Sequence, residues 1–171
     1  DPAQESKHCG SCTACLEICP TQAFNGPFEL DARKCISYLT IEKSGEIPIE
    51  LRSKLGNRVF GCDDCQLVCP WNKFAKHSHE NDFTPRHQLD NAELIDLFLW
   101  TEQQFEQYTQ GSAIRRIGYE NWLRNLAVGI GNSRYSDQAI RALNQQADFS
   151  ALVHEHAHWA INALLKNRDA Q

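Results

Sequence analysis

Hydrophobic side chains recur at helical spacing in the second half of the chain, from about residue 90 onward. One run predicts a helix that Gly131-Asn132 ends, and its apolar positions are Trp122, Leu123, Leu126, Ala127 and Ile130. Two further helices are expected over residues 137–146 and 150–165. The second of these carries one apolar stripe, made of Leu152, Val153, Ala157, Ile161 and Leu164. Short antiparallel helices joined by short turns predict a HEAT-like helical unit.

Two sequence signals mark helix starts earlier in this half. Asn91 precedes the run Ala-Glu-Leu-Ile-Asp-Leu-Phe and is a candidate N-cap. Thr101 and Gln104 stand at the spacing of a capping box, in which each side chain bonds the other residue's backbone N–H. We therefore expect helices to begin just after Asn91 and Thr101.

The first half shows no sustained helical periodicity. Prolines and glycines between short apolar pieces predict short strands and turns over residues 20–34. The segment 35–42 is rich in residues that favour strands, and Ser44-Gly45 marks a turn. Residues 50–55 predict a short helix, and the polar stretch 76–88 is typical of a linker.

Composition narrows the class of protein. The chain is 42% hydrophobic and 23% charged, as soluble globular proteins are. No apolar stretch approaches the ~20 residues that cross a bilayer and no signal-like segment opens the chain, so we expect a cytoplasmic protein without a membrane partner. The chain has no Met and starts Asp1-Pro2, so we expect a piece of a longer protein.

The net charge of −5 argues against a broadly basic nucleic-acid-binding domain. The charge is unevenly spread, because residues 112–171 hold seven basic and five acidic side chains. Any contact with nucleic acid is therefore expected from a local patch in this part of the chain.

The eight cysteines all lie within the first 69 residues, and disulfides, zinc and iron–sulfur clusters compete as explanations. Disulfides are disfavoured, because the chain shows no export signal and cytosolic thiols stay reduced. Zinc sites use Cys-x2-Cys pairs, but usually as isolated pairs separated by loops. Here one unbroken run matches that of bacterial two-cluster ferredoxins: Cys9-x2-Cys12-x2-Cys15-x3-Cys19-Pro20. The pattern favours two [4Fe–4S] clusters.

A second run repeats the end of the first, as Cys62-x2-Cys65-x3-Cys69-Pro70. Its opening position is Val59, and Cys35 is the only spare cysteine, so we expect Cys35 to fill the gap. In ferredoxins the last cysteine of each run ligates the other cluster. This rule assigns Cys9, Cys12, Cys15 and Cys69 to cluster 1, and Cys19, Cys35, Cys62 and Cys65 to cluster 2.

These patterns together predict an α+β protein, a monomer, in which a ferredoxin-like two-cluster domain precedes a HEAT-like helical domain. The cluster domain would span residues 1–75, with an insert at 35–60. Residues 76–90 would form the linker, and residues 91–171 the helical domain.

Two further groups admit either a structural or a functional interpretation. His154-Glu155-His156-Ala157-His158 matches the H-E-x-x-H pattern of zinc proteases, but a solvated helix face explains it more simply because no third ligand is evident. Arg115, Arg116 and Arg124 are either ordinary charges on a helix surface or clamps for phosphate. The sequence leaves that choice open.

Several blocks of the sequence resemble the epoxyqueuosine reductase family: residues 9–20, 31–42, 56–72, 111–118 and 122–125. The resemblance covers nearly the whole chain. It implies an oxidoreductase that removes the epoxide oxygen from epoxyqueuosine at the wobble position of certain tRNAs, which completes queuosine biosynthesis. It also implies cobalamin and two [4Fe–4S] clusters as cofactors, with electrons from an external donor reaching the cobalt through the clusters.

In that family a cobalamin-binding domain with the proposed proton donor precedes the cluster domain, and this sequence begins just before Cys9. We therefore expect no catalytic residue here and no turnover by the chain alone. Ser37 and Asp63 are expected to face the cobalamin of the full-length enzyme. Arg115 and Arg116 would lie where the tRNA anticodon stem-loop docks. The alternatives are a free-standing ferredoxin-like electron carrier with a helical interaction module, and a zinc-binding interaction protein.

Overall fold

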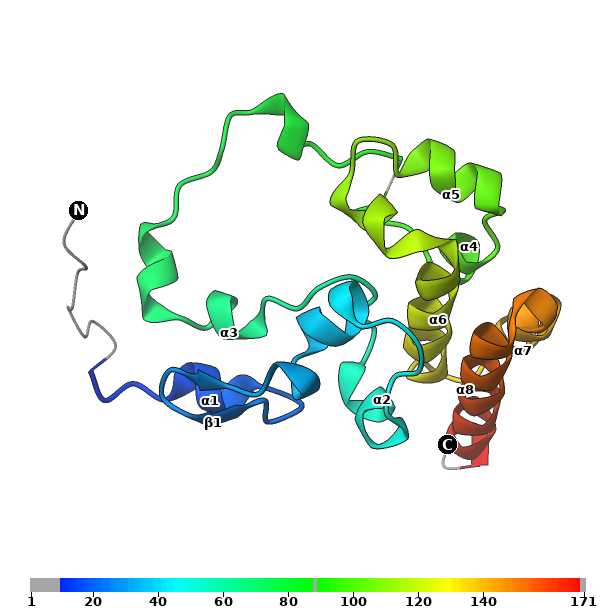
Figure 1. Cartoon of the computed structure of the whole chain (residues 1–171), viewed down its shortest axis with the longest axis horizontal. Helices are drawn as coiled ribbons and strands as arrows, with labels where there is room; N and C mark the ends of the chain where they lie inside the picture. Colours follow the sequence, from blue (N-terminus) through cyan, green and yellow to red (C-terminus); the bar gives the residue numbers. More distant parts are fainter. Residues whose placement is uncertain (1–9, 88, 170–171) are drawn as a thin grey trace.

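The structure is a computed structural model that describes residues 10–87 and 89–169, and it is mostly helical (Figure 1). Its first part holds helix α1 (Ala14–Ile18), strands β1 (Phe24–Gly26) and β2 (Glu29–Leu30), and helices α2 (Ile49–Leu55) and α3 (Asp64–Leu67). Its second part holds helices α4 (Leu94–Phe98), α5 (Glu102–Tyr108), α6 (Gly118–Gly131), α7 (Asp137–Gln146) and α8 (Ala151–Asp169). No helix in these described ranges is long and apolar enough to span a membrane.

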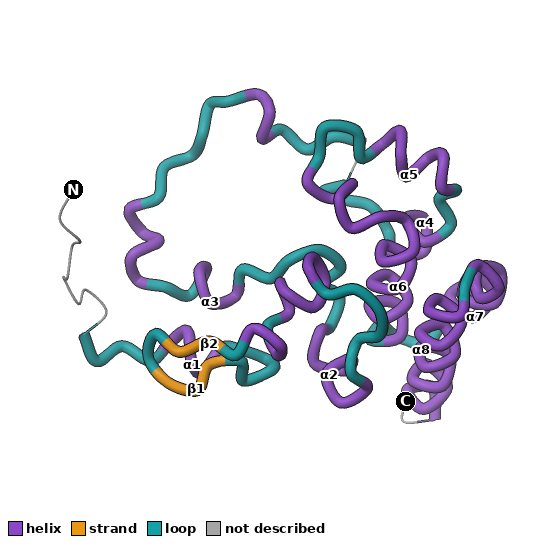
Figure 2. Tube along the Cα trace, viewed as in Figure 1, coloured by secondary structure: helices purple, strands orange, loops and turns teal. Residues whose placement is uncertain are grey.

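The short strands expected among the turns of residues 20–34 are present. Strands β1 and β2 pair antiparallel, with Phe24 opposite Leu30 and Gly26 opposite Glu29 (Figure 2). The resulting hairpin lies beside α1. A single 3₁₀ turn, Ala32–Lys34, follows it and leads to Cys35. The short helix expected over residues 50–55 is also confirmed, as α2.

The strand-like composition of residues 35–42 gives a wrong expectation. The segment Tyr38–Glu42 is a π-helical turn, closed by the N–H of Lys43 bonding to the carbonyl of Tyr38 at 2.9 Å. Helical geometry points the buried Ile36 and Leu39 into a small apolar core, with Ile47 and Leu55 beside them. Tertiary burial therefore overrides the local preference for strand.

Helix boundaries in the second part follow the local signals where those signals are complete. Thr101 and Gln104 form the expected capping box at the start of α5, and α6 ends at Gly131 as expected. Asn91 is not an N-cap: its side chain bonds the carboxylate of Asp90 at 3.0 Å, and α4 begins only at Leu94. Helix α7 has its predicted bounds, and α8 runs beyond the predicted end to Asp169.

Helix α6 packs against α8 on one side and α4 on another (Figure 1). It is buried from Trp122 to Gly131. Gly131 permits the close approach to α8, because a Cβ there would stand only 2.8 Å from the Cα of Ala160. Val128 of α6 also closes the small core below the π-helical turn, so both parts of the chain share this helix.

Candidate iron–sulfur centre

Two short helices organise the cysteines. Helices α1 and α3 pack against each other, and each follows a glycine in the left-handed region, Gly10 with φ of 55° and Gly61 with φ of 81°. Glycine adopts these angles without the Cβ clash that other residues meet. Each helix carries a cysteine at its second position and is followed by the Cys-Pro pair that ends the run. The repeat seen in the sequence is therefore a repeat in space.

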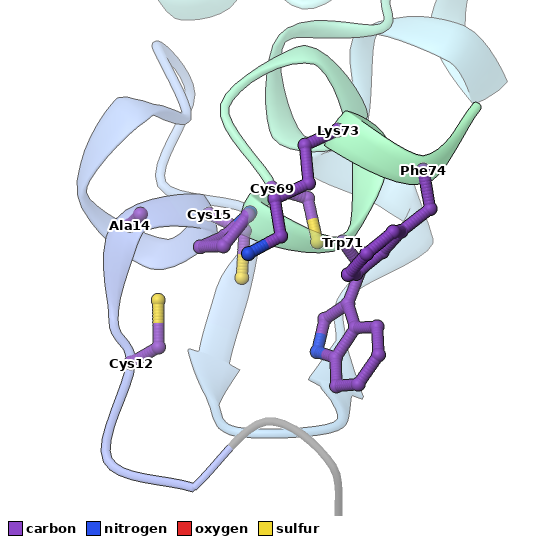
Figure 3. Close-up of a pocket in the computed structure, with 8 residues that line it drawn as sticks. Cys12, Ala14, Cys15, Cys69, Trp71, Lys73 and Phe74 are labelled. Atoms are coloured by element: carbon purple, nitrogen blue, oxygen red, sulfur yellow. The ribbon is translucent and has the colours of Figure 1, made fainter. Parts of the chain in front are cut away.

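Cys12, Cys15 and Cys69 line one cavity of about 320 Å³, and their sulfur atoms point into a shared space (Figure 3). Two cysteines come from the first run and one from the end of the second. Cys9, the fourth ligand expected for cluster 1, lies outside the described residues.

The rim of this cavity is aromatic and basic. The rings of Trp71 and Phe74 pack with centroids 5.7 Å apart, on a 3₁₀ helix that spans Pro70–Phe74. Lys73 extends over the cavity toward Cys15 in Figure 3, and its Nζ lies 4.9 Å from the centre of the Phe74 ring. Apolar walls of this kind limit water around a bound group, and the lysine adds a positive charge beside it.

Cys19, Cys35, Cys62 and Cys65 line a second cavity, together with the apolar side chains of Ala23, Phe24, Leu30 and Ile36. These cysteines come from the end of the first run, the insert and the start of the second run. Asp64 also lines this cavity, and its carboxylate pairs with Arg58 at 2.5 Å. The second cavity therefore brings four thiols together from three separate stretches of sequence.

The thiols of this second cavity differ in their electrostatics. Burial raises the pKa of the Cys62 and Cys65 thiols, and at Cys65 the neighbouring Cys62 raises it further. Burial also acts to raise the pKa of Cys19, but hydrogen bonds outweigh it and lower the pKa overall. The Ala23 N–H donates to the Cys19 sulfur at 3.3 Å, and the Thr21 hydroxyl lies 3.5 Å from it. N–H···S contacts of this kind surround the thiolates of metal centres, and a bound metal would stabilise the buried thiolates.

The donor sets fit [4Fe–4S] clusters. A cubane takes four thiolates at its corners, and the second cavity supplies four while the first supplies three described ones. The alternation between runs follows the ferredoxin exchange of the last cysteine.

Ser37 and Asp63 both lie at the start of the second run. The Ser37 hydroxyl accepts the Cys62 N–H at 2.9 Å and donates to the Cys62 carbonyl at 3.1 Å. The Asp63 carboxylate accepts from the Gln66 side chain at 2.8 Å. Their expected contact with cobalamin stays a prediction.

The three arginines considered as phosphate clamps do not form one group. Arg115 and Arg116 are exposed on the 3₁₀ helix Ala113–Ile117, where they pair with Glu106 and Glu42 respectively. Arg124 is fully buried and donates to the carbonyls of residues 39, 43 and 45, so its assignment as a surface charge or clamp is wrong. Desolvation lowers the pKa of Arg124 to about 10.

The histidine motif on α8 has a structural role. His156 has no exposed surface, and its Nε2 accepts the N–H of Ile47 at 3.1 Å. Glu155 receives two hydrogen bonds from the buried Arg52, at 2.9 and 2.8 Å. Among the described residues, no three His, Cys, Asp or Glu side chains gather closely enough to hold a single metal ion.

Sequence comparison identifies the cysteine-bearing part directly. Residues 8–72 match the model of the 4Fe-4S double cluster binding domain. The chain is 62% identical over 162 residues to epoxyqueuosine reductase of Pseudomonas aeruginosa, covering 94% of the chain and 45% of that protein. It is 50% identical over 169 residues to epoxyqueuosine reductase of Escherichia coli, covering 99% of the chain and 44% of that protein. The chain is a homologue of the epoxyqueuosine reductases.

Solved structures agree with this relationship. Epoxyqueuosine reductase from Bacillus subtilis superposes with a TM-score of 0.85 at 32% identity, covering 93% of this chain and 43% of that one. A crystal structure of an epoxyqueuosine reductase with a tRNA-Tyr epoxyqueuosine-modified stem loop gives a TM-score of 0.83 at 32% identity, covering 91% and 42%. The chain thus spans less than half the length of the relatives it matches.

Proposed function

We propose that this chain is the iron–sulfur electron-relay and tRNA-docking portion of an epoxyqueuosine reductase, the enzyme that reduces epoxyqueuosine to queuosine in tRNA. The observation that carries this proposal is the sorting of the cysteines into two cavities, within a segment that matches a double-cluster domain. The epoxyqueuosine reductase relatives, which match 94% or more of the chain in the two cases given, supply the reaction.

In this proposal cluster 1 is held by Cys9, Cys12, Cys15 and Cys69, and cluster 2 by Cys19, Cys35, Cys62 and Cys65. The four cysteines that line the second cavity support the second set, and the three described cysteines of the first cavity support the first. The clusters would supply one-electron transfer at low potential. The chain's own part is to bind them, to donate hydrogen bonds to their thiolates and to screen them from water.

The remaining assignments extend this scheme. Residues 1–75, with the insert at 35–60, would form the ferredoxin-like cluster domain, residues 76–90 the linker and residues 91–171 the HEAT-like helical domain. An external donor would reduce the clusters. Cobalamin would bind in the full-length enzyme near Ser37 and Asp63, and the chain alone would not turn over. In this scheme the protein is a monomer that acts on tRNA in the cytoplasm.

Docking of tRNA is assigned to Arg115 and Arg116. Their side chains are 46% and 59% exposed, so their guanidinium groups are open to a phosphate even though each contacts an acidic side chain. The relative solved with a tRNA-Tyr stem loop supports a nucleic-acid partner for this fold. Phosphate contacts by arginine give affinity that falls with salt.

Anaerobic reconstitution of the chain tests the cluster assignment. Two cubanes predict about eight irons and eight sulfides per chain. Stoichiometric zinc without sulfide would instead identify a zinc-binding protein and end the proposal.

Cys35→Ala tests the ligand sets. It should leave about four irons, because only cluster 2 loses a ligand. Cys12→Ala is the matched variant and should leave the other cluster, with a different electron paramagnetic resonance (EPR) spectrum. Identical residual spectra in the two variants, or full iron content in Cys35→Ala, would show the assignment to be wrong.

A chimera tests the reaction and the docking surface. This chain would replace the matching segment of the Pseudomonas aeruginosa relative, and queuosine formation on epoxyqueuosine-containing tRNA would be measured. We expect activity in the chimera and none when it carries Cys35→Ala. Serine at both Arg115 and Arg116 should weaken stem-loop binding and reduce its salt slope by about 2, whereas the exposed Arg134→Ser should change neither.

A further inference from the structure

The two backbone amides at the start of the second cysteine run have partners in the insert. The Cys62 N–H donates to the Ser37 hydroxyl at 2.9 Å, and the Gly61 N–H donates to the Thr40 hydroxyl at 3.0 Å. Ser37 is the N-cap of the π-helical turn and Thr40 lies within it, and both hydroxyls are directed toward the same stretch of backbone. One face of the turn thus binds two successive amides beside the second cavity.

Each hydroxyl also donates its own proton to a backbone carbonyl. Ser37 donates back to the Cys62 carbonyl at 3.1 Å, and Thr40 donates to the Ile36 carbonyl at 2.7 Å. Because each hydroxyl proton has a carbonyl acceptor, the hydroxyl oxygen is oriented to accept an amide N–H. Thr40 is 1% exposed, so water does not compete for its bond.

Helix α6 holds this arrangement in place. The Asn125 side-chain amide donates to the Thr40 carbonyl at 2.8 Å and to the Val59 carbonyl at 2.9 Å. The Asn125 side chain therefore holds two segments next to each other: the turn that carries both hydroxyls and the stretch that leads to Gly61. Hydrogen bonds within the protein hold this geometry, which is what a positioning device requires.

We propose that Ser37 and Thr40 form an amide clamp that withholds the Gly61 and Cys62 N–H groups from cluster 2 and so keeps its reduction potential low. The proposal rests on the proposed function, because it needs a cluster held by Cys62. Hydrogen bonds to cluster sulfurs raise the potential, since they stabilise the more negative, reduced state. An amide that bonds a hydroxyl is not available to a sulfur. Ser37 and Thr40 are therefore positioning residues for electron transfer.

A redox titration of the reconstituted chain, followed by EPR, tests the clamp. In Ser37→Ala the potential of cluster 2 should move to more positive values, while that of cluster 1 stays unchanged. Ser37→Thr keeps a hydroxyl and should restore the wild-type potential, and Ser53→Ala on the exposed face of α2 should have no effect. Thr40→Val should shift the potential of cluster 2 in the same direction.

The outcomes separate this inference from the proposed function. If the wild-type chain binds no cluster, the proposed function fails. If both clusters form but Ser37→Ala and Thr40→Val leave the potential of cluster 2 unchanged or more negative, the clamp is refuted. Loss of cluster 2 in both variants would also refute it, because the hydroxyls would then serve assembly rather than potential.

Discussion

His156 lies on α8 with no exposed side-chain surface, and its environment predicts a measurable loss of stability in mild acid. Its Nε2 accepts the Ile47 N–H, and its Nδ1 lies 2.8 Å from the Leu152 carbonyl. The neutral ring with its proton on Nδ1 satisfies both partners. Protonation of Nε2 would place a proton against the Ile47 N–H, so the charged form loses a bond and gains a clash.

Burial is the main cause that lowers the pKa of His156, to about 4 from an ordinary value of 6.5. The charged groups around it are Arg52 of α2, Glu155 of α8 and Arg124 of α6, of which the two arginines lower the pKa and Glu155 raises it. The carbonyl of Leu152 also raises it. Burial and the two arginines outweigh these contributions, so the folded protein keeps His156 neutral.

The sign of the pH effect follows from proton binding. Above about pH 6.5 neither the folded nor the unfolded chain protonates His156, so it has no effect on the free energy of unfolding. As the pH falls toward 4 only the unfolded chain binds the proton, and stability is lost. The shift corresponds to roughly 3 kcal/mol in full, and to about 2 kcal/mol between pH 7 and pH 5.

Urea unfolding followed by circular dichroism at pH 7 and pH 5 measures this loss. His156→Gln removes the titrating ring and retains an acceptor, so its unfolding free energy should fall by about 2 kcal/mol less than that of the wild type over this interval. His154→Gln, an exposed change on the same helix, should leave the wild-type pH dependence in place. An equal pH dependence in His156→Gln and the wild type would refute the reasoning.

Two further substitutions test the packing around α6. Gly131→Ala should destabilise the chain by about 1–3 kcal/mol, because the new Cβ would stand 2.7–2.9 Å from atoms of α8. Gly26→Ala meets no atom within 4 Å and is the control, and equal unfolding midpoints for the two variants would contradict the prediction. Asn125→Ala should cost about 1–3 kcal/mol in urea unfolding, since the Thr40 and Val59 carbonyls each lose a buried donor. No change in stability would show that those carbonyls find other partners.

Local signals in the sequence predict local structure well here. The capping box of Thr101 and Gln104 needs only four residues, and the bounds of α7 follow from its flanking turns. The repeated cysteine spacing likewise corresponds to two short helices, α1 and α3, that present thiols at similar positions. In each case the physical cause lies within a few residues of the effect, so the pattern carries enough information.

Hydrogen bonds between residues that are distant in sequence cannot be predicted from such local signals. Arg124 bonds the carbonyls of Leu39 and Gly45, which lie 85 and 79 residues away, and nothing near Arg124 indicates burial of its charge. Ser37 stands 25 residues from Cys62, so its hydrogen bonds to that backbone could not be read from spacing. Arg124 and Asn125 stand at helical positions opposite the predicted apolar stripe of Trp122, Leu126 and Ile130, so the sequence pattern predicts solvent exposure for both side chains.

These buried polar contacts explain why the insert has a defined position. A buried guanidinium is costly unless its donors are satisfied, and Arg124 donates to three backbone carbonyls and to the Asn125 side chain. One of these carbonyls, that of Leu39, belongs to the turn Tyr38–Glu42, and the other two, those of Lys43 and Gly45, follow it, so Arg124 of α6 holds this segment in place. Cys35 and Ser37 stand just before that turn, so the placement of the turn also fixes theirs. The helical part of the chain thereby determines where two groups of the second cavity stand, a constraint that cysteine spacing alone could not impose.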